Sequence, residues 1–207
     1  ISLTRNIPIV YGVHDLWPEA IAATGMMSNP LLLKGLGALE RFVYQRASAI
    51  GVISPGYRQN LIHKGVPEEK ITVLSDWADG DIYRPVQPDK TLAQSTGMTG
   101  KFNVLFAGNM GSAQALETVI DAAQRLTQHP DIQFVFVGDG IDRPRLETLV
   151  SEKNLSNVIF LGRQPVEQMP HLYALSDVLL AHYKKDPLFE ISIPGKIAGY
   201  LGCQRPI

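Results

Sequence analysis

The sequence predicts an α/β protein whose strands run parallel in two separate sheets. Short runs rich in Val, Ile and Phe alternate with segments whose apolar residues recur every three or four positions, the pattern of strands followed by amphipathic helices. A stretch rich in Asp, Pro, Gly, Gln and Thr, residues 75–100, interrupts this alternation and predicts a domain boundary. Because each strand is followed by a helix, both sheets are expected to be parallel with right-handed crossovers.

The first 75 residues predict three strands with helices between them. The strands, which are short apolar runs bounded by polar turns, are expected at residues 7–13, 49–54 and 71–74, with the first of them buried. The helices are expected from Pro18 onward, at residues 31–46 and from Pro55, since proline suits a first helical turn.

The segment at residues 31–46 is apolar on one predicted side. Leu32, Leu36, Leu39, Val43 and Arg46 are spaced for one helical face. A core helix is the more common origin of such a face, and contact with a membrane surface is the alternative.

A second alternation of strands and helices begins at Phe102. Its strands are expected at residues 102–108, 132–137, 158–161 and 178–181. Its helices are expected at residues 113–126, 143–152, 166–174 and 194–201, with a loop at 183–193 before the last of them.

Composition limits the classes of protein. The chain has 207 residues, of which 45% are apolar, and a formal net charge of −1. Such a charge argues against a protein that binds nucleic acid by neutralising phosphates. The single cysteine, Cys203, excludes an internal disulfide and fits a reducing compartment. No segment is long and apolar enough to span a membrane, and both ends of the chain suggest a fragment of a longer protein.

Glycine or charge follows the strands of the second half. The turn after the strand at 102–108 contains Gly108, Asn109, Gly111 and Ser112, where glycines allow a phosphate to approach the backbone. A tight connection between strand and helix is the alternative explanation of this GxxG spacing. Gly138 and Arg163 follow the next two strands, and parallel strands end at one edge of their sheet. These positions predict a nucleotide-type site at that edge.

Pro194-Gly195-Lys196 is the second indication of an anion site. Proline suits the first helical turn, and Lys196 adds a cation at the positive end of the helix. An anion beside Lys196 would offset that local repulsion, whereas a solvent-facing lysine is the alternative. Glu190 lies just before this segment. Its carboxylate is expected either to contact a sugar hydroxyl or to face solvent.

Polar residues also follow the strand at 7–13. His14 is a candidate site residue because side chains after a parallel strand face the crevice where α/β proteins bind ligands, and a structural histidine is the alternative. Asp15 is either a helix cap or a site residue.

Six blocks in a fixed order resemble the retaining glycosyltransferases of the GT-B fold, family 4, in the branch that builds bacterial surface polysaccharides. The blocks are VHDLWPEAIAATGM (13–26), VISPGYRQNLIHKGVPEEKITVL (52–74), FAGNMGSAQALETVIDAA (106–123), FVFVGDG (134–140), VIFLGRQPVEQMPHLYALSDVLL (158–180) and SIPGKIAGYLGCQRPI (192–207).

The resemblance implies two Rossmann-like domains, both truncated. Residues 1–75 would be the later part of an acceptor-binding domain, 76–100 a linker, and 101–207 an incomplete domain for the nucleotide-sugar donor. It implies that His14 lies near the donor sugar, that the turn at 108–112 cradles the diphosphate, and that the loops at Gly138 and Arg163 hold the nucleoside.

The chain departs from the family pattern at several positions. Asn109 and Ala115 stand where the family often has an Arg and a Lys, which leaves Lys196 as the main side-chain cation. The family also carries two glutamates eight positions apart near the donor sugar and the ribose. Gly199 replaces the second glutamate, and Glu190 lies beside the position of the first.

The resemblance implies transfer of a hexose or N-acetylhexosamine from a nucleotide-diphosphate sugar, with uridine as the expected base, to a lipid-linked or saccharide acceptor. His14 and Glu190 are the candidate catalytic residues. The expected location is the cytoplasm, with peripheral contact at the inner face of the membrane. No metal or other cofactor is expected, since no ligand cluster has metal-binding spacing. A non-catalytic nucleotide-sugar-binding protein and a nucleotide-sugar 2-epimerase are the alternatives.

Overall fold

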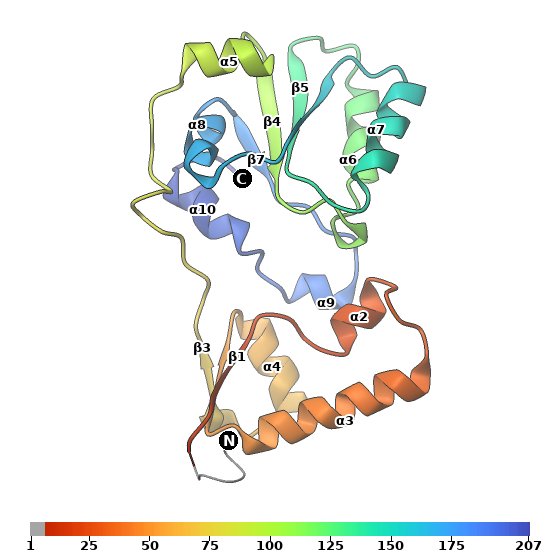
Figure 1. The fold of residues 1–207 in the computed structure, drawn as a ribbon, viewed down its shortest axis with the longest axis vertical. Helices are drawn as coiled ribbons and strands as arrows, with labels where there is room; N and C mark the ends of the chain where they lie inside the picture. The colour runs from red at the N-terminus through yellow and green to blue at the C-terminus, as the bar shows by residue number, and fades with distance from the viewer. Residues whose placement is uncertain (1–6) are drawn as a thin grey trace. The chain divides into compact units, whose positions relative to one another are not determined.

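The computed structural model of the protein describes residues 7–207. They form two compact units, each with its own parallel sheet (Figure 1). The first unit ends at Asp76 but also contains Lys185–Ile193, and the second contains Trp77–Lys184 and Pro194–Ile207. The predicted α/β class with two parallel sheets is confirmed. The first six residues of the expected acceptor domain, 1–75, lie outside the described residues.

The first unit has a three-stranded parallel sheet in the order β1-β2-β3. Its core joins Ile50 and Val52 of the middle strand to Tyr57 and Leu61 of the following helix. The strands are β1 (Val10–Val13), β2 (Ala49–Val52) and β3 (Ile71–Val73). The helices are α2 (Glu19–Ala23), α3 (Pro30–Arg46), α4 (Pro55–His63), η1 (Glu68–Lys70) and α9 (Pro187–Glu190).

The first strand differs from its prediction. β1 begins at Val10, not at Ile7, and three of its four residues are exposed, with Val10 at 74%. β1 is an edge strand of this sheet, and within it only Val13 reaches the core. An apolar run therefore predicted a strand correctly but overestimated its burial.

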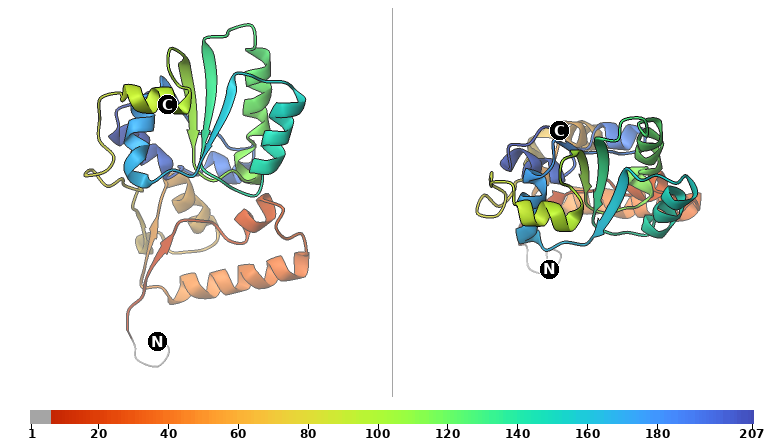
Figure 2. Two further views of the ribbon diagram at one scale, coloured as in Figure 1. Left: turned by 45° about the horizontal axis from the view of Figure 1, so that its top comes forward. Right: turned by 90° about the horizontal axis from the view of Figure 1, so that it is seen from above.

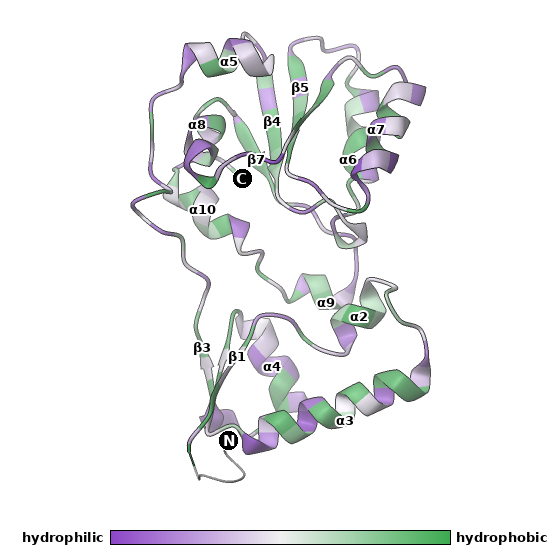
Figure 3. Ribbon diagram, viewed as in Figure 1, coloured by the Kyte–Doolittle hydropathy of each residue, from purple (hydrophilic) through white to green (hydrophobic). Residues whose placement is uncertain are grey.

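α3 buries a different face from the predicted one. Leu32 and Leu39 are 54% and 59% exposed, whereas Gly37 and Tyr44 are buried. Figure 3 shows that hydrophobic positions recur along α3. The buried side is polar as well as apolar, because Glu40 accepts a hydrogen bond from the Tyr44 hydroxyl at 2.8 Å. The apolar spacing was misleading because Glu40, on the buried side of α3, pairs with the lysine described next.

Lys64 connects three helices of the first unit. Its Nζ lies 2.7 Å from a carboxylate oxygen of Glu19 on α2 and 2.8 Å from one of Glu40 on α3. The side chains of Lys64 and Glu40 are only 17% and 8% exposed. Removal of one partner of a buried pair leaves an uncompensated charge, which is costly.

We expect Lys64→Ala to lower the free energy of unfolding by about 3 kcal/mol, because the Glu40 carboxylate would stay buried without its cation. Urea unfolding followed by circular dichroism measures this. The double variant Lys64→Met with Glu40→Gln should lose much less than the sum of the single changes. Additive losses would show that the pair is not coupled.

The second unit has a four-stranded parallel sheet in the order β6-β5-β4-β7. The strands are β4 (Phe102–Ala107), β5 (Ile132–Val137), β6 (Val158–Gly162) and β7 (Val178–Leu180). The helices are α5 (Lys90–Thr96), η2 (Ser112–Gln114), α6 (Glu117–Arg125), α7 (Arg143–Glu152), η3 (Val166–Gln168), α8 (Met169–Ala174) and α10 (Lys196–Gly202).

Helices cover both faces of this sheet, as Figures 1 and 2 show. Leu105 and Val135 face a cluster that includes residues of α8 and α10. Phe106 and Phe136, their neighbours along the strands, face a cluster formed with α6 and α7. Successive side chains of a strand point to opposite faces, so this sheet is buried on both sides.

Two segments are placed differently from the expected domain limits. The segment expected as a linker, 76–100, belongs to the second unit from Trp77 onward and contains α5, whose start is capped by the Asp89 carboxylate. The expected loop at 183–193 contains α9 and joins the first unit from Lys185 to Ile193. There the Ser54 hydroxyl, which also caps α4, donates to the carbonyl of Ile191 at 2.6 Å.

Candidate functional site

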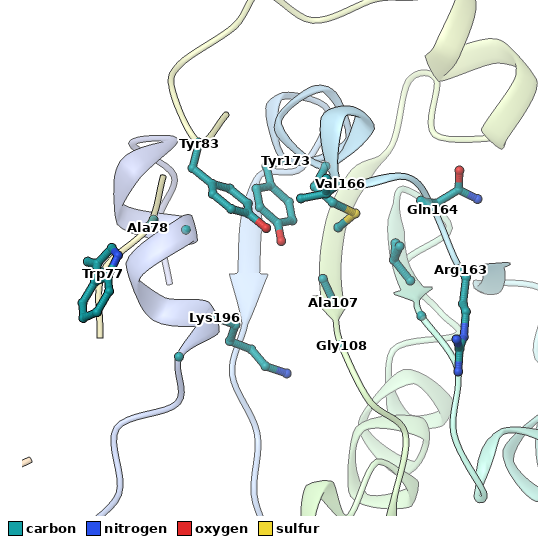
Figure 4. A pocket seen from close by; sticks show the side chains of 15 residues that line it. Trp77, Ala78, Tyr83, Ala107, Gly108, Arg163, Gln164, Val166, Tyr173 and Lys196 are labelled. Carbon is teal, nitrogen blue, oxygen red and sulfur yellow. The ribbon is translucent and has the colours of Figure 1, made fainter. Parts of the chain in front are cut away.

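A cavity of about 540 Å³ opens in the second unit where β4 and β5 end (Figure 4). This is the carboxyl edge of a parallel sheet, where α/β proteins bind ligands. None of the described residues that line it is an Asp or Glu. The lining residues are Trp77, Ala78, Tyr83, Ala107, Gly108, Val137, Gly138, Arg163, Gln164, Val166, Met169, Tyr173, Gly195, Lys196 and Gly199.

Lys196 is the half-buried cation of this cavity. It is the first residue of α10, and its Nζ lies 3.8 Å from the centre of the Phe106 ring. Burial lowers the pKa of Lys196 to about 8. Within residues 7–207, no carboxylate forms a salt bridge with Lys196. The face of the Phe106 ring lies beside its ammonium group instead. Such a cation is suited to an anionic ligand.

Gly108 leaves room for the lysine. Its φ is +138°, and a Cβ at this position would lie 2.9 Å from Nζ of Lys196. Gly138 serves the packing of the loops themselves, because a Cβ there would lie 2.1 Å from the carbonyl oxygen of Gly108. The two glycines therefore bring two strand ends into direct backbone contact beside the cation.

The turn at residues 108–112, the expected phosphate cradle, uses part of its amides in hydrogen bonds within the chain. The N–H groups of Gly108, Met110 and Gly111 donate to Val137 O (2.9 Å), Asp139 O (2.8 Å) and Gln114 Oε1 (3.1 Å). At least three of its five amides are thus already used within the chain.

The helix expected at residue 113 begins only at Glu117, after a turn of η2 and Ala115, whose φ is +44°. The positive end of a helix therefore does not follow this turn directly.

The predicted donor-binding residues divide into two sets. Five line the cavity: Gly108, Gly138, Arg163, Gly195 and Lys196. Four are not among its lining residues: Asn109, Gly111, Ser112 and Pro194. The Arg163 side chain is 83% exposed, and its Nε lies 3.5 Å from a carboxylate oxygen of Asp139.

The two candidate catalytic residues belong to the first unit. His14 follows β1, is 69% exposed in its side chain, and has Nδ1 3.5 Å from Oδ1 of Asp76. Glu190 is the exposed last residue of α9. α2 begins without a side-chain cap, so Asp15 does not cap it. The catalytic roles stay predictions.

Sequence reasoning missed the aromatic wall of the cavity. The rings of Tyr83 and Tyr173 stack with their centres 6.3 Å apart, and Tyr173 meets the edge of Tyr200 at 5.1 Å. The Tyr200 hydroxyl accepts from the N–H of Ala107 at 3.2 Å, which ties α10 to the end of β4. The apolar spacing of α8 and α10 indicated that these helices pack in a core. The composition around Tyr83 is typical of a loop, so nothing in the sequence indicated that Tyr83 packs against these helices.

Another missed residue is His182, which follows β7. Its Nδ1 lies 2.7 Å from the carbonyl oxygen of Gln114, and Lys184 donates its N–H to Ala113 at 2.9 Å. The segment after β7 thus holds η2 in place.

Within residues 7–207, His, Cys, Asp and Glu form no group of three or more that could hold a metal ion.

Comparisons with known proteins identify the family of this chain. The family pattern described as "Glycosyl transferases group 1" matches residues 89–188, and "Glycosyl transferase 4-like domain" matches residues 2–77. The chain belongs to the group 1 glycosyltransferases of family 4, with the GT-B fold. The predicted family is therefore confirmed.

Two curated relatives have named activities. A candidate colanic acid biosynthesis glycosyl transferase of Escherichia coli is 29% identical over 79% of this chain and 40% of its own length. The alpha-galactosylglucosyldiacylglycerol synthase of Streptococcus pneumoniae is 26% identical over 88% of this chain and 49% of its own. The chain spans about half the length of the curated relatives it matches.

A solved structure supports the fold. The crystal structure of Anabaena HepE in complex with UDP and glucose superimposes with a TM-score of 0.76 at 21% identity, over 99% of this chain and 53% of that one. No helix within residues 7–207 has the length and apolar character needed to cross a membrane.

Proposed function

We propose that the chain acts in a retaining glycosyltransferase that moves a hexose or N-acetylhexosamine from a UDP-sugar to a lipid-linked or saccharide acceptor. The observation that carries the proposal is the half-buried Lys196, unpaired within residues 7–207, in a cavity lined by no described acid. A nucleoside diphosphate supplies the anion that such a cavity lacks. The first unit would bind the acceptor and the second the donor.

The chemical task is to stabilise the diphosphate as the bond to the sugar breaks. Negative charge grows on the leaving phosphate, and a preorganised cation in a partly dry site lowers the barrier to its departure. Lys196 would provide this charge, and the exposed Arg163 would add a second cation. His14 and Glu190 would act on the donor sugar, a role that rests on the resemblance alone.

The names of related proteins support uridine and a lipid acceptor. The Anabaena structures hold UDP, UDP-glucose, or UDP and glucose, and the Streptococcus enzyme is named for a diacylglycerol glycolipid. A Mycobacterium tuberculosis relative is instead named a GDP-mannose-dependent mannosyltransferase. The proposed location is the cytoplasm at the inner membrane face, with the exposed apolar residues of α3, Leu31, Leu32, Leu39 and Phe42, toward the lipid surface.

Calorimetric titration with UDP, GDP and ADP tests the proposal. We expect UDP to bind most tightly, with GDP and ADP at least tenfold weaker. Tighter binding of GDP would correct the base, and no binding of any diphosphate would overturn the proposed donor site.

A non-catalytic binding protein is the second candidate, because Gly199 stands where the family has a glutamate. Incubation of the chain with UDP-sugars and saccharide or lipid acceptors separates the two. Release of UDP together with a glycosylated product supports the transferase, and binding without turnover supports the second candidate.

A further inference from the structure

Two phenol groups of the cavity lack a hydrogen-bond partner in the described part of the chain. Tyr83 and Tyr173 stack with an angle of 18° between their rings, and both line the cavity. Figure 4 shows their hydroxyl groups side by side on the edge that faces the open space above Lys196. The third tyrosine of this cluster, Tyr200, is different, because its hydroxyl is bound by Ala107.

Tyr83 is held in place by two glycines of α10. A Cβ at Gly199 would lie 3.1 Å from two carbons of the Tyr83 ring, and a Cβ at Gly202 would lie 2.8 Å from the Tyr83 carbonyl oxygen. The absence of side chains at these two positions therefore lets the segment that carries Tyr83 rest on the helix. Tyr83 occupies the space that a longer side chain at position 199 would need.

We infer that the hydroxyls of Tyr83 and Tyr173 bind the two ribose hydroxyls of a nucleoside diphosphate; this assignment rests on the proposed donor site. A phenol hydroxyl both donates and accepts, as a ribose hydroxyl does, so two such pairs satisfy all four groups. Since no described lining residue is an acid, the phenols are the groups that supply this contact in place of a carboxylate.

The order of groups along the cavity fits one ligand orientation. The cation Lys196 lies at one side, the phenols of Tyr83 and Tyr173 follow, and the apolar Val166 lies beyond them (Figure 4). A nucleotide has the same order of phosphate, hydroxylated ring and base. Tyrosine hydroxyls stay neutral around pH 7. We therefore expect their hydrogen bonds to the ribose to be independent of pH in the neutral range.

The test uses UDP and 2′,3′-dideoxy-UDP as probes in calorimetry. We expect the unmodified chain to bind UDP about tenfold more tightly than the dideoxy compound, since two hydrogen bonds together contribute roughly that factor. Tyr83→Phe and Tyr173→Phe each remove one hydroxyl while keeping the ring. Each is expected to reduce the preference about threefold, and the double variant to abolish it.

Tyr200→Phe is the matched control, because it removes a phenol that is already used by the backbone. It should leave the preference for UDP unchanged. Equal binding of both probes by the unmodified chain, or a full preference in the double variant, would overturn the ribose assignment alone, provided that UDP still binds. Failure of UDP to bind at all would overturn the proposed donor site with it.

Gly199→Glu provides an independent test of how Tyr83 is seated. The added side chain must displace the Tyr83 ring, so we expect weaker UDP binding and loss of the preference for the ribose hydroxyls. A second change, Tyr83→Ala, makes room for the glutamate, whose carboxylate can then accept hydrogen bonds from the ribose hydroxyls, and should recover UDP binding in the Gly199→Glu background. Unchanged binding in Gly199→Glu alone would show that Tyr83 does not contact the ligand.

Discussion

Lys196→Met is expected to weaken the binding of UDP by about 10- to 150-fold, the range for loss of a hydrogen bond between charged groups. Methionine keeps the length and apolar contacts of the side chain, including the neighbourhood of the Phe106 ring. Calorimetry measures the loss. Lys90→Met removes an exposed lysine from the same unit and should leave affinity unchanged. An equal effect of both variants would point to net charge alone.

The affinity of the unmodified chain should also depend on pH. The pKa of Lys196 in the free protein is about 8, and a bound diphosphate raises it, because the anion favours the charged amine. UDP affinity is therefore highest below pH 8 and falls as the pH rises above it, by at most tenfold per pH unit. Titrations between pH 7 and pH 9.5 should show this fall in the unmodified chain and a flat profile in Lys196→Met.

The same pKa has the opposite consequence for the stability of the unliganded protein. The ordinary pKa of 10.5 applies to the unfolded chain, so between about pH 8 and 10.5 the unfolded chain binds more protons than the folded one. This contribution therefore makes stability rise with pH across that window. Below pH 8 the buried, charged amine of Lys196 lowers the stability of the folded protein by its full amount. There Lys196→Met should raise the melting temperature, although it removes most of the UDP binding.

Gly138→Ala should be among the most damaging single changes in the chain. The new methyl group would lie 2.1 Å from the carbonyl oxygen of Gly108, and φ at this position is +124°. Neither loop can yield easily, because Gly108 and Gly138 donate their N–H groups to Val137 and Gly162. We expect a loss of more than about 3 kcal/mol in the free energy of unfolding, measured in urea.

Gly97→Ala separates backbone strain from collision in this experiment. Gly97 also has a positive φ, +72°, but no atom lies within 4 Å of an added Cβ. It should lose only about 1 kcal/mol, the cost of the left-handed conformation. Equal losses in Gly97→Ala and Gly138→Ala would mean that the two strand-end loops move apart without cost.

The buried strands and the cation were predictable because their signals are local. β4 and β5 are apolar apart from one polar residue each, Asn103 and Gln133, and short runs of this kind indicate buried strands. Lys196 was found because Pro194 and Gly195 mark the start of a helix beside it. Both inferences use only neighbours in sequence.

The remaining features depend on contacts distant in sequence. Tyr83 looked like part of a linker, and only the glycines of α10, more than a hundred positions later, explain its burial. The orientation of α3 depends on Lys64, a residue beyond the next strand. Ala115 adopts φ of +44° inside an apparently continuous helical pattern, so periodicity could not show where α6 begins.

Residues 185–193 have a consequence for the order in which the protein folds during synthesis. Leu188 completes the buried core of the first unit, Ile191 packs against that core, and the Ile191 carbonyl accepts the hydrogen bond from Ser54. A ribosome makes these residues only after Trp77–Lys184 of the second unit have been translated. The unit that emerges first must therefore wait, with its hydrophobic surface incomplete, for a segment that follows Asp76 by more than a hundred residues.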